Sequence, residues 1–130
     1  MGKKVLVIDD DPGIVKLDEA LLKSKGYEVI SAGDGLSGVE RAIEDQPDVI
    51  ILDVILPNMH GFEVCKNLKN NPNTEFIPIV MVTATGLEDI AESESDIQAD
   101  AYLAKPYGID KLEEAIQTAI HKKTQNPPSN

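Results

Sequence analysis

The chain has 130 residues, of which 42% are hydrophobic and 27% are charged, with one cysteine and no tryptophan. This length suits a single domain whose aliphatic core needs neither disulfides nor a structural metal. An excess of 23 acidic over 12 basic residues gives a formal charge of −11, which argues against direct binding to nucleic acid or to an anionic membrane.

The first half of the chain alternates strand and helix patterns. Residues 5–8 are apolar on both alternating faces, which predicts a buried strand. Pro12 suits the first turn of the helix that follows, and Gly26 suits its C-terminal cap. A weaker strand at residues 27–31 and a second helix around residues 36–43 come next.

Two further buried strands are predicted in the middle of the chain, at residues 49–52 and 77–82. Both are rich in β-branched residues, as central strands of a parallel sheet are. The apolar residues between them recur at helical spacing over residues 62–68 and predict a third helix, which the turn-forming residues 70–72 would end.

The last third of the chain is less regular. Residues 88–100 hold six acids and no bases, so we expect a marginal, mobile helix with either a solvated face or a surface for a basic partner. A short strand at residues 101–104 precedes the final helix, whose apolar stripe runs over residues 109–120. We expect one domain at residues 1–121, and a disordered tail or truncated linker at residues 122–130.

Strand followed by helix, repeated five times, predicts an α/β fold with a parallel sheet and right-handed crossovers. Helices then cover both faces of the sheet. In open sheets of this kind, side chains at the carboxyl ends of the strands converge where the strand order reverses. Functional residues are therefore expected directly after the first, third, fourth and fifth strands.

Acidic residues stand at two of these places. Asp9, Asp10 and Asp11 follow the first strand, and Asp53 follows the third. Crowded carboxylates raise one another's pKa unless a cation with oxygen ligands relieves the repulsion, so we expect Mg²⁺ here. Asp11 is better explained as a helix cap. For Asp9, Asp10 and Asp53, the alternative is that they are solvent-exposed acids at strand ends without a function. The end of a buried strand is an unfavourable place for a charge that has no partner.

Groups of opposite polarity stand at the other two places, with Thr83 at the end of the fourth strand and Lys105 after the fifth. Singly, each is more often a strand threonine or a solvated surface lysine. Aimed together at Asp53 and a metal, a hydroxyl and an ammonium would form a pocket for a tetrahedral dianion.

These motifs resemble the response-regulator receiver domains of two-component signalling, in particular the single-domain, chemotaxis-regulator-like members. The resemblance extends from about Lys4 to His121. It implies a flavodoxin-like (βα)5 three-layer sandwich with a five-stranded parallel sheet of order 2-1-3-4-5. The segments that carry it are residues 5–12, 47–53, 56–61, 82–84 and 101–106.

The resemblance assigns a role to each site residue. Asp53 would accept a phosphoryl group from a phosphohistidine on a sensor histidine kinase or histidine phosphotransfer protein. The metal, Mg²⁺ or Mn²⁺, would be held by Asp10, by Asp53 and by the backbone carbonyl of Ile55, with Asp9 acting through water. Such a domain is a regulatory phosphoacceptor that catalyses only its own phosphorylation and dephosphorylation.

The resemblance also implies a switch. Lys105 would pair with the phosphoryl oxygens, Thr83 would move to hydrogen-bond them, and Tyr102 would turn inward, although a half-buried strand tyrosine explains Tyr102 equally well. A phosphate brings new hydrogen bonds worth a few kcal/mol, and a shift of roughly 5 kcal/mol turns a two-state domain from mostly off to mostly on. The downstream protein would bind the fourth helix, fifth strand and fifth helix.

Four positions depart from the common family pattern. His60 stands where an acid is frequent, and we expect an exposed loop residue there. Gln98 stands where glycine is usual. Ile55 and Thr85 are neither acidic nor amide, so no side chain is placed to orient an attacking water, and we predict slow self-dephosphorylation.

Other functions fit the sequence less well. An aspartyl-phosphate phosphatase of the haloacid dehalogenase type would need a second aspartate where Ile55 stands, and a flavin or nucleotide carrier would need a phosphate loop where the three aspartates stand. A receiver used only for docking would have lost Asp53, Lys105 or the acidic pair Asp9 and Asp10, and none of these is lost. The lone Cys65 excludes an intrachain disulfide, and no apolar run suits a secretory signal or a membrane span, so we expect a cytoplasmic location.

Overall fold

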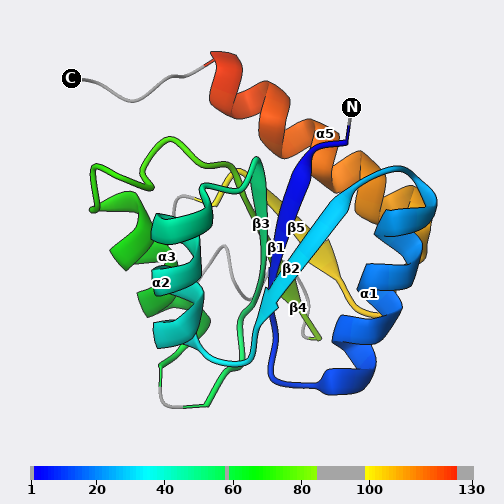
Figure 1. The fold of residues 1–130 in the computed structure, drawn as a ribbon, viewed down its shortest axis with the longest axis horizontal. Helices are drawn as coiled ribbons and strands as arrows, with labels where there is room; N and C mark the ends of the chain where they lie inside the picture. Colours follow the sequence, from blue (N-terminus) through cyan, green and yellow to red (C-terminus); the bar gives the residue numbers. More distant parts are fainter. Residues whose placement is uncertain (1, 58, 85–98, 126–130) are drawn as a thin grey trace.

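The computed structural model describes residues 2–57, 59–84 and 99–125, and it has the predicted α/β fold. Its sheet has the predicted order β2-β1-β3-β4-β5, and every adjacent pair of strands is parallel (Figure 1). The strands are β1 (Lys4–Ile8), β2 (Glu28–Ala32), β3 (Val49–Asp53), β4 (Ile79–Thr83) and β5 (Ala101–Ala104).

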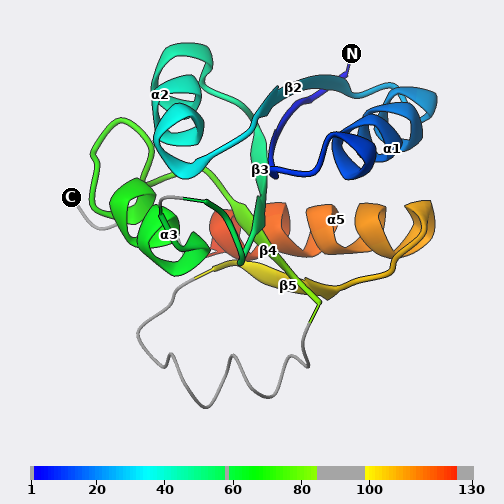
Figure 2. The same ribbon diagram turned by 90° about the horizontal axis from the view of Figure 1, so that it is seen from below.

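Helices cover both faces of this sheet, so the three-layer prediction is confirmed. Helices α1 and α5 lie on one face, and α2 and α3 lie on the other (Figure 2). The described helices are α1 (Pro12–Ser24), α2 (Gly35–Asp45), α3 (Gly61–Lys69) and α5 (Ile109–Gln125). The acidic helix predicted at residues 88–100 falls outside the described residues except for Ala99 and Asp100.

The sheet separates two hydrophobic cores. Leu6 and Ile8 of β1 belong to the core under α2 and α3, whereas Val5 and Val7 belong to the core under α1 and α5. All four side chains are at most 1% exposed. Because successive strand residues point to opposite faces, a strand buried on both sides is apolar throughout, as the sequence pattern indicated.

Both predicted caps of α1 are present. The Asp11 carboxylate accepts a hydrogen bond from the backbone N–H of Gly13 (2.8 Å). At the other end, Gly26 has a φ of +89°, its N–H donates to the Lys23 carbonyl (3.0 Å), and the next N–H donates to the Leu22 carbonyl (3.1 Å). This is a Schellman cap, and it requires a left-handed residue that glycine adopts without strain.

The predicted start of one strand is wrong, and the last helix extends beyond residue 121. Strand β4 begins at Ile79 rather than at residue 77, because Pro78 has no N–H to donate to the sheet. Helix α5 continues to Gln125, so the boundary predicted at residue 121 falls inside it. Its last turn is held by Lys123, whose ammonium donates to the carbonyl of Glu75 (3.1 Å). None of the described helices is long and apolar enough to cross a membrane.

Candidate functional site

Three carboxylates converge at the carboxyl ends of β1 and β3. Each of Asp9, Asp10 and Asp53 has an oxygen within 4.8 Å of the others. The convergence follows from the register, in which Ile8 of β1 is paired with Leu52 of β3, so that the residues after them are neighbours. Asp9 and Asp53 are buried and Asp10 is exposed, so the cluster has a wall and an open side.

Lys105 places an ammonium against this cluster. Its Nζ lies 3.1 Å from Oδ2 of Asp53 and 3.5 Å from Oδ2 of Asp9, and its backbone N–H donates to the carbonyl of Thr83 (2.8 Å). Burial lowers the pKa of Lys105, but the hydrogen bond and charge of Asp53, together with Asp9, outweigh burial and raise that pKa above its usual value. The side chain therefore remains a cation at neutral pH.

Asp9 is affected mainly by its burial and to a smaller extent by the nearby carboxylate of Asp53. Burial raises the pKa of this carboxyl, the backbone N–H of Asp11 (2.9 Å from Oδ1) lowers it, and the charge of Asp53 raises it again, so that the net shift is upward. A hard divalent cation with oxygen ligands would relieve this repulsion. The cluster of Asp9, Asp10 and Asp53 therefore fits a divalent metal ion such as Mg²⁺.

The turn after β3 lies close against Asp53. The backbone N–H of Ile55 donates to Oδ1 of Asp53 (3.2 Å), and the N–H of Gly61 donates to the carbonyl of Val54 (2.7 Å). A Cβ at residue 61 would collide with the carbonyl oxygen of Asp53 and with Val54. Glycine is therefore required where α3 begins beside the acidic cluster.

Thr83 and Tyr102 lie on neighbouring strands. Thr83 is the last residue of β4 and is buried, and Tyr102 of β5 is half-buried and paired with Met81. Met81 and Tyr102 both belong to the core under α2 and α3. Since Thr83 is two residues from Met81 on the same strand, its side chain points to this face as well. The two residues predicted to move together thus share one side of the sheet.

His60 has a role that the sequence did not indicate. Its side chain is exposed, as predicted, but it is the N-cap of α3 rather than an ordinary loop residue. Nδ1 accepts a hydrogen bond from the backbone N–H of Phe62 (3.1 Å), and the two rings lie 4.5 Å apart. Within the described part of the chain, the group of residues that could hold a metal consists of Asp9, Asp10 and Asp53 and does not include His60.

Two buried acids were missed at the sequence level. Asp18 of α1 accepts hydrogen bonds from the hydroxyl of Tyr107 (2.9 and 3.0 Å). Asp100, before β5, accepts from the backbone N–H of Ile79 (2.9 Å) and from Lys69 (3.0 Å). A signal existed for each: Asp18 interrupts the apolar stripe of α1, and Asp100 directly precedes a buried strand.

Some predictions concern residues that the structure does not describe. Thr85 and Gln98 lie outside the described ranges, as does most of the predicted acidic helix. The mobility of that helix and the predicted slow loss of the phosphoryl group therefore remain predictions.

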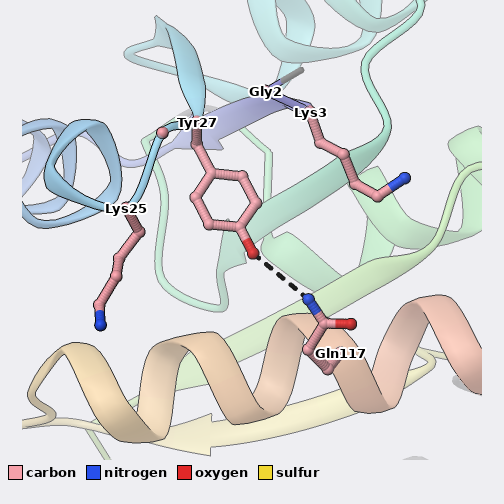
Figure 3. A pocket seen from close by; sticks show the side chains of 6 residues that line it. Gly2, Lys3, Lys25, Tyr27 and Gln117 are labelled. Carbon is pink, nitrogen blue, oxygen red and sulfur yellow. Dashed lines mark hydrogen bonds between the residues drawn. The ribbon is translucent and has the colours of Figure 1, made fainter.

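A hollow lies at the opposite end of the domain from the acidic cluster. It has a volume of about 330 Å³ and surrounds Tyr27, whose hydroxyl accepts a hydrogen bond from Nε2 of Gln117 (3.4 Å). The side chains of Lys3 and Lys25 extend away from that hydroxyl (Figure 3). Charged groups converge at the carboxyl ends of the strands and not here, so the acidic cluster is the better candidate site.

Comparisons with known proteins identify the family of the chain. A family model described as the response regulator receiver domain matches residues 5–117. The chain is 36% identical over 124 residues to the DNA-binding dual master transcriptional regulator RpaA of Synechocystis sp., a match that covers 95% of the chain and 52% of RpaA. The chain thus spans about half the length of this curated relative.

Solved structures share the fold over nearly the whole chain. The chemotaxis response regulator CheY4 of Vibrio cholerae is 32% identical, with a TM-score of 0.84 over 92% of this chain and 99% of CheY4. The receiver domain of the sensor histidine kinase PA1611 from Pseudomonas aeruginosa is 30% identical, with a TM-score of 0.84 over 93% of this chain and 99% of that one. The latter structure has a magnesium ion coordinated in its active-site cleft.

Proposed function

Because the chain belongs to the response regulator receiver domains, we propose that Asp53 accepts a phosphoryl group and that its phosphorylation switches a protein-interaction surface. Response regulators work with histidine kinases, so the donor is a phosphohistidine on a sensor kinase or on a phosphotransfer protein. The observation that carries the proposal is the 3.1 Å contact between Lys105 and Asp53 inside a cluster of three carboxylates.

The transfer exchanges one bond to phosphorus for another. A carboxylate oxygen of Asp53 attacks the phosphorus atom while the bond from phosphorus to the imidazole nitrogen breaks, and the nitrogen keeps that electron pair. Lys105 is placed to neutralise charge on the phosphoryl oxygens during this exchange. The present contact between the Lys105 ammonium and the Asp53 carboxylate supports this role. A phosphoryl group attached to that carboxylate would place its negative oxygens close to the ammonium.

A divalent cation completes the proposed site. Asp10, Asp53 and the backbone carbonyl of Ile55 would hold Mg²⁺ or Mn²⁺, with Asp9 acting through water, and the ion would neutralise charge on the acceptor and on the incoming group. The close approach of the Asp9, Asp10 and Asp53 carboxylates supports this assignment. So does the magnesium ion in the related PA1611 receiver domain.

The output surface is proposed to include β5 and α5, together with the fourth helix of the family. A hollow of about 290 Å³ lies between β5 and α5 and includes Tyr102, which we propose turns inward when Thr83 binds the phosphoryl group. The residues around the hollow are Ala101, Tyr102, Leu103, Lys111, Glu114, Ala115 and Thr118. A surface of this mixed polarity suits a protein partner.

We further propose that the domain is regulatory, with catalysis limited to its own phosphorylation and dephosphorylation. Ile55 stands where a haloacid-dehalogenase phosphatase would need a second aspartate. The charge of −11 disfavours direct contact of this domain with DNA, even though RpaA is named a DNA-binding regulator. The single, buried cysteine Cys65 suits the reducing cytoplasm.

Intact-mass measurement after incubation with Mg²⁺ and acetyl phosphate tests the phosphoacceptor role. We expect the wild type to gain one phosphoryl group and Asp53→Ala to gain none. Asp110→Ala is the matched control, because it removes an acid from the exposed first turn of α5 and should leave the gain unchanged. An unmodified wild type, or equal modification of Asp53→Ala, would refute the proposal.

A further inference from the structure

A buried hydrogen-bonded pair joins α1 to the loop that follows Lys105. Asp18 is 1% exposed, and the Tyr107 hydroxyl lies 2.9 Å from one of its carboxylate oxygens and 3.0 Å from the other. Tyr107 is itself half-buried and packs against the core under α1 and α5. The hydroxyl is therefore fixed on both sides, by packing around its ring and by the carboxylate at its tip.

The pair connects the two sides of the acidic site. On one side, α1 begins after Asp11, whose backbone N–H donates to Asp9, and Asp18 lies about two helical turns further along the same helix. On the other side, Tyr107 is two residues beyond Lys105, whose ammonium reaches the carboxylates. A rigid helix and a short loop thus meet at a single hydrogen-bonded contact.

The loop between β5 and α5 is short and has anchors at both ends. The backbone N–H of Lys105 donates to the Thr83 carbonyl (2.8 Å), and the carbonyl of Gly108 accepts from the first turn of α5 (3.1 Å). Tyr107 adds a side-chain anchor to α1 between these two points. Because the lysine ammonium is carried by this loop, a displacement of the loop would move the ammonium relative to Asp53.

Stability alone does not account for an acid at this place. Burial raises the pKa of Asp18 to about 6, against which the hydrogen bond from Tyr107 acts only in part. Two apolar side chains of similar shape usually stabilise such a site as well or better. The acid and the phenol add geometric precision. A hydrogen bond restrains both the distance and the angle between its two groups, whereas an apolar contact restrains neither closely.

We propose that Asp18 and Tyr107 are positioning residues that hold Lys105 at its working distance from Asp53. The inference rests on the proposed phosphoacceptor function of Asp53. Misplacing a reacting or charge-stabilising group by about 1 Å can cost up to about a hundredfold in rate. Loss of the pair should therefore slow phosphoryl transfer without changing the three carboxylates that would hold the metal.

Phosphorylation kinetics with acetyl phosphate test this role. Tyr107→Phe removes only the hydroxyl, and the double variant Asp18→Leu/Tyr107→Phe also removes the acid, so that no unpaired carboxylate is left buried. Below the unfolding transition of each protein, we expect the limiting rate to fall about tenfold in both variants. The Mg²⁺ concentration for half-maximal rate should stay unchanged, which a general loss of structure would not give.

Two further variants complete the design. Asp18→Asn keeps an oxygen that can accept from the Tyr107 hydroxyl, so its rate should remain within about twofold of the wild type. Tyr27→Phe removes the hydroxyl of the tyrosine shown in Figure 3, at the far end of the domain, and should have no effect on the rate.

The outcomes separate this proposal from the proposed function. If the wild type is phosphorylated on Asp53 and the double variant is equally fast, Asp18 and Tyr107 do not position Lys105. A slow Asp18→Asn variant, or a weakened Mg²⁺ dependence in the double variant, would overturn the proposal as well. If the wild type itself is not phosphorylated, the phosphoacceptor function has failed instead.

Discussion

The two ends of the sheet each hold buried acid against lysine, but in opposite proportions. At the carboxyl ends of the strands, three carboxylates, Asp9, Asp10 and Asp53, face the single ammonium of Lys105. Negative charge is in excess there, and one carboxylate is exposed. A bound cation at this end of the sheet would offset that excess of negative charge.

At the amino ends the proportions are reversed. Asp100 lies 3.0 Å from Lys69 and 3.7 Å from Lys123, and it also accepts a hydrogen bond from the backbone N–H of Ile79 (2.9 Å). One acid is thus surrounded by two ammoniums and a peptide group. These contacts join α3, α5 and the starts of β4 and β5, and they leave the Asp100 carboxylate well paired.

The lysines report this difference through their pKa values. Burial and the neighbouring charge of Lys69 lower the pKa of Lys123 to about 8, although Asp100 acts in the other direction. The carboxylates around Lys105 outweigh burial and raise its pKa. The same kind of ion pair therefore belongs to a candidate metal site where acids are in excess, and to a structural clamp where they are not.

The largest expected effect comes from breaking the clamp. Asp100→Ala would leave two partly buried ammoniums and the N–H of Ile79 without their acceptor, so we expect the free energy of unfolding to fall by about 3 to 5 kcal/mol. Urea denaturation at pH 7 measures the change. Asp100→Asn should lose less, because its amide oxygen still accepts from Ile79. A change below 1 kcal/mol in both variants would show that the clamp is not structural.

A lysine substitution at each end sharpens the comparison. Lys105→Gln should slow phosphorylation by acetyl phosphate by about a hundredfold, because a positioned charge on the phosphoryl oxygens is lost. Lys123→Gln should instead lower stability and leave that rate within about twofold of the wild type. The division between the two ends is disproved if both substitutions slow phosphorylation equally at temperatures where both proteins are folded.

The smallest effect concerns Asp18 and pH. Its pKa of about 6 in the folded protein exceeds the ordinary value of 3.8, so the folded state binds more protons between these values. Stability from this group is complete below about pH 4 and is lost as the pH rises through 6, by about 2 to 3 kcal/mol. Asp18→Asn cannot titrate and serves as the control. Urea denaturation of both proteins from pH 4.5 to 7.5 should show the wild type losing about 2 to 3 kcal/mol relative to Asp18→Asn as the pH rises. A difference in unfolding free energy that stays constant over this range would contradict the prediction.

The fold and the acidic cluster could be predicted because both follow from local pattern and topology. Apolar strands identify themselves, and parallel strands bring the residues after them, such as Asp9 and Asp53, to one edge. The sequence was enough to predict that Lys105 lies near Asp53, whereas their 3.1 Å contact could be seen only in the structure. Thr83 and Tyr102 were found through family resemblance rather than through a pattern of their own.

The amino-end clamp could not be predicted in the same way. Lys69, Asp100 and Lys123 meet only because two helices end beside the start of β5. The hydrophobic periodicity of a sequence predicts a helix but not where the end of that helix lies in the folded protein. Residue 123 even belongs to the segment predicted as a tail, since polar composition hides a lysine that is held by a buried acid. Asp18 and Tyr107 are 89 residues apart and were missed for the same reason.

Helix α5 is fastened differently at its two ends. Its last turn is pinned by Lys123, whereas its first turn continues from the loop that carries Lys105 and Tyr107. A displacement of that loop would therefore pivot α5 about its far end. The largest displacement of α5 would then occur near Lys111, at the rim of the hollow between β5 and α5. A small shift beside Asp53 would thus become a larger displacement at a surface that a partner protein could contact.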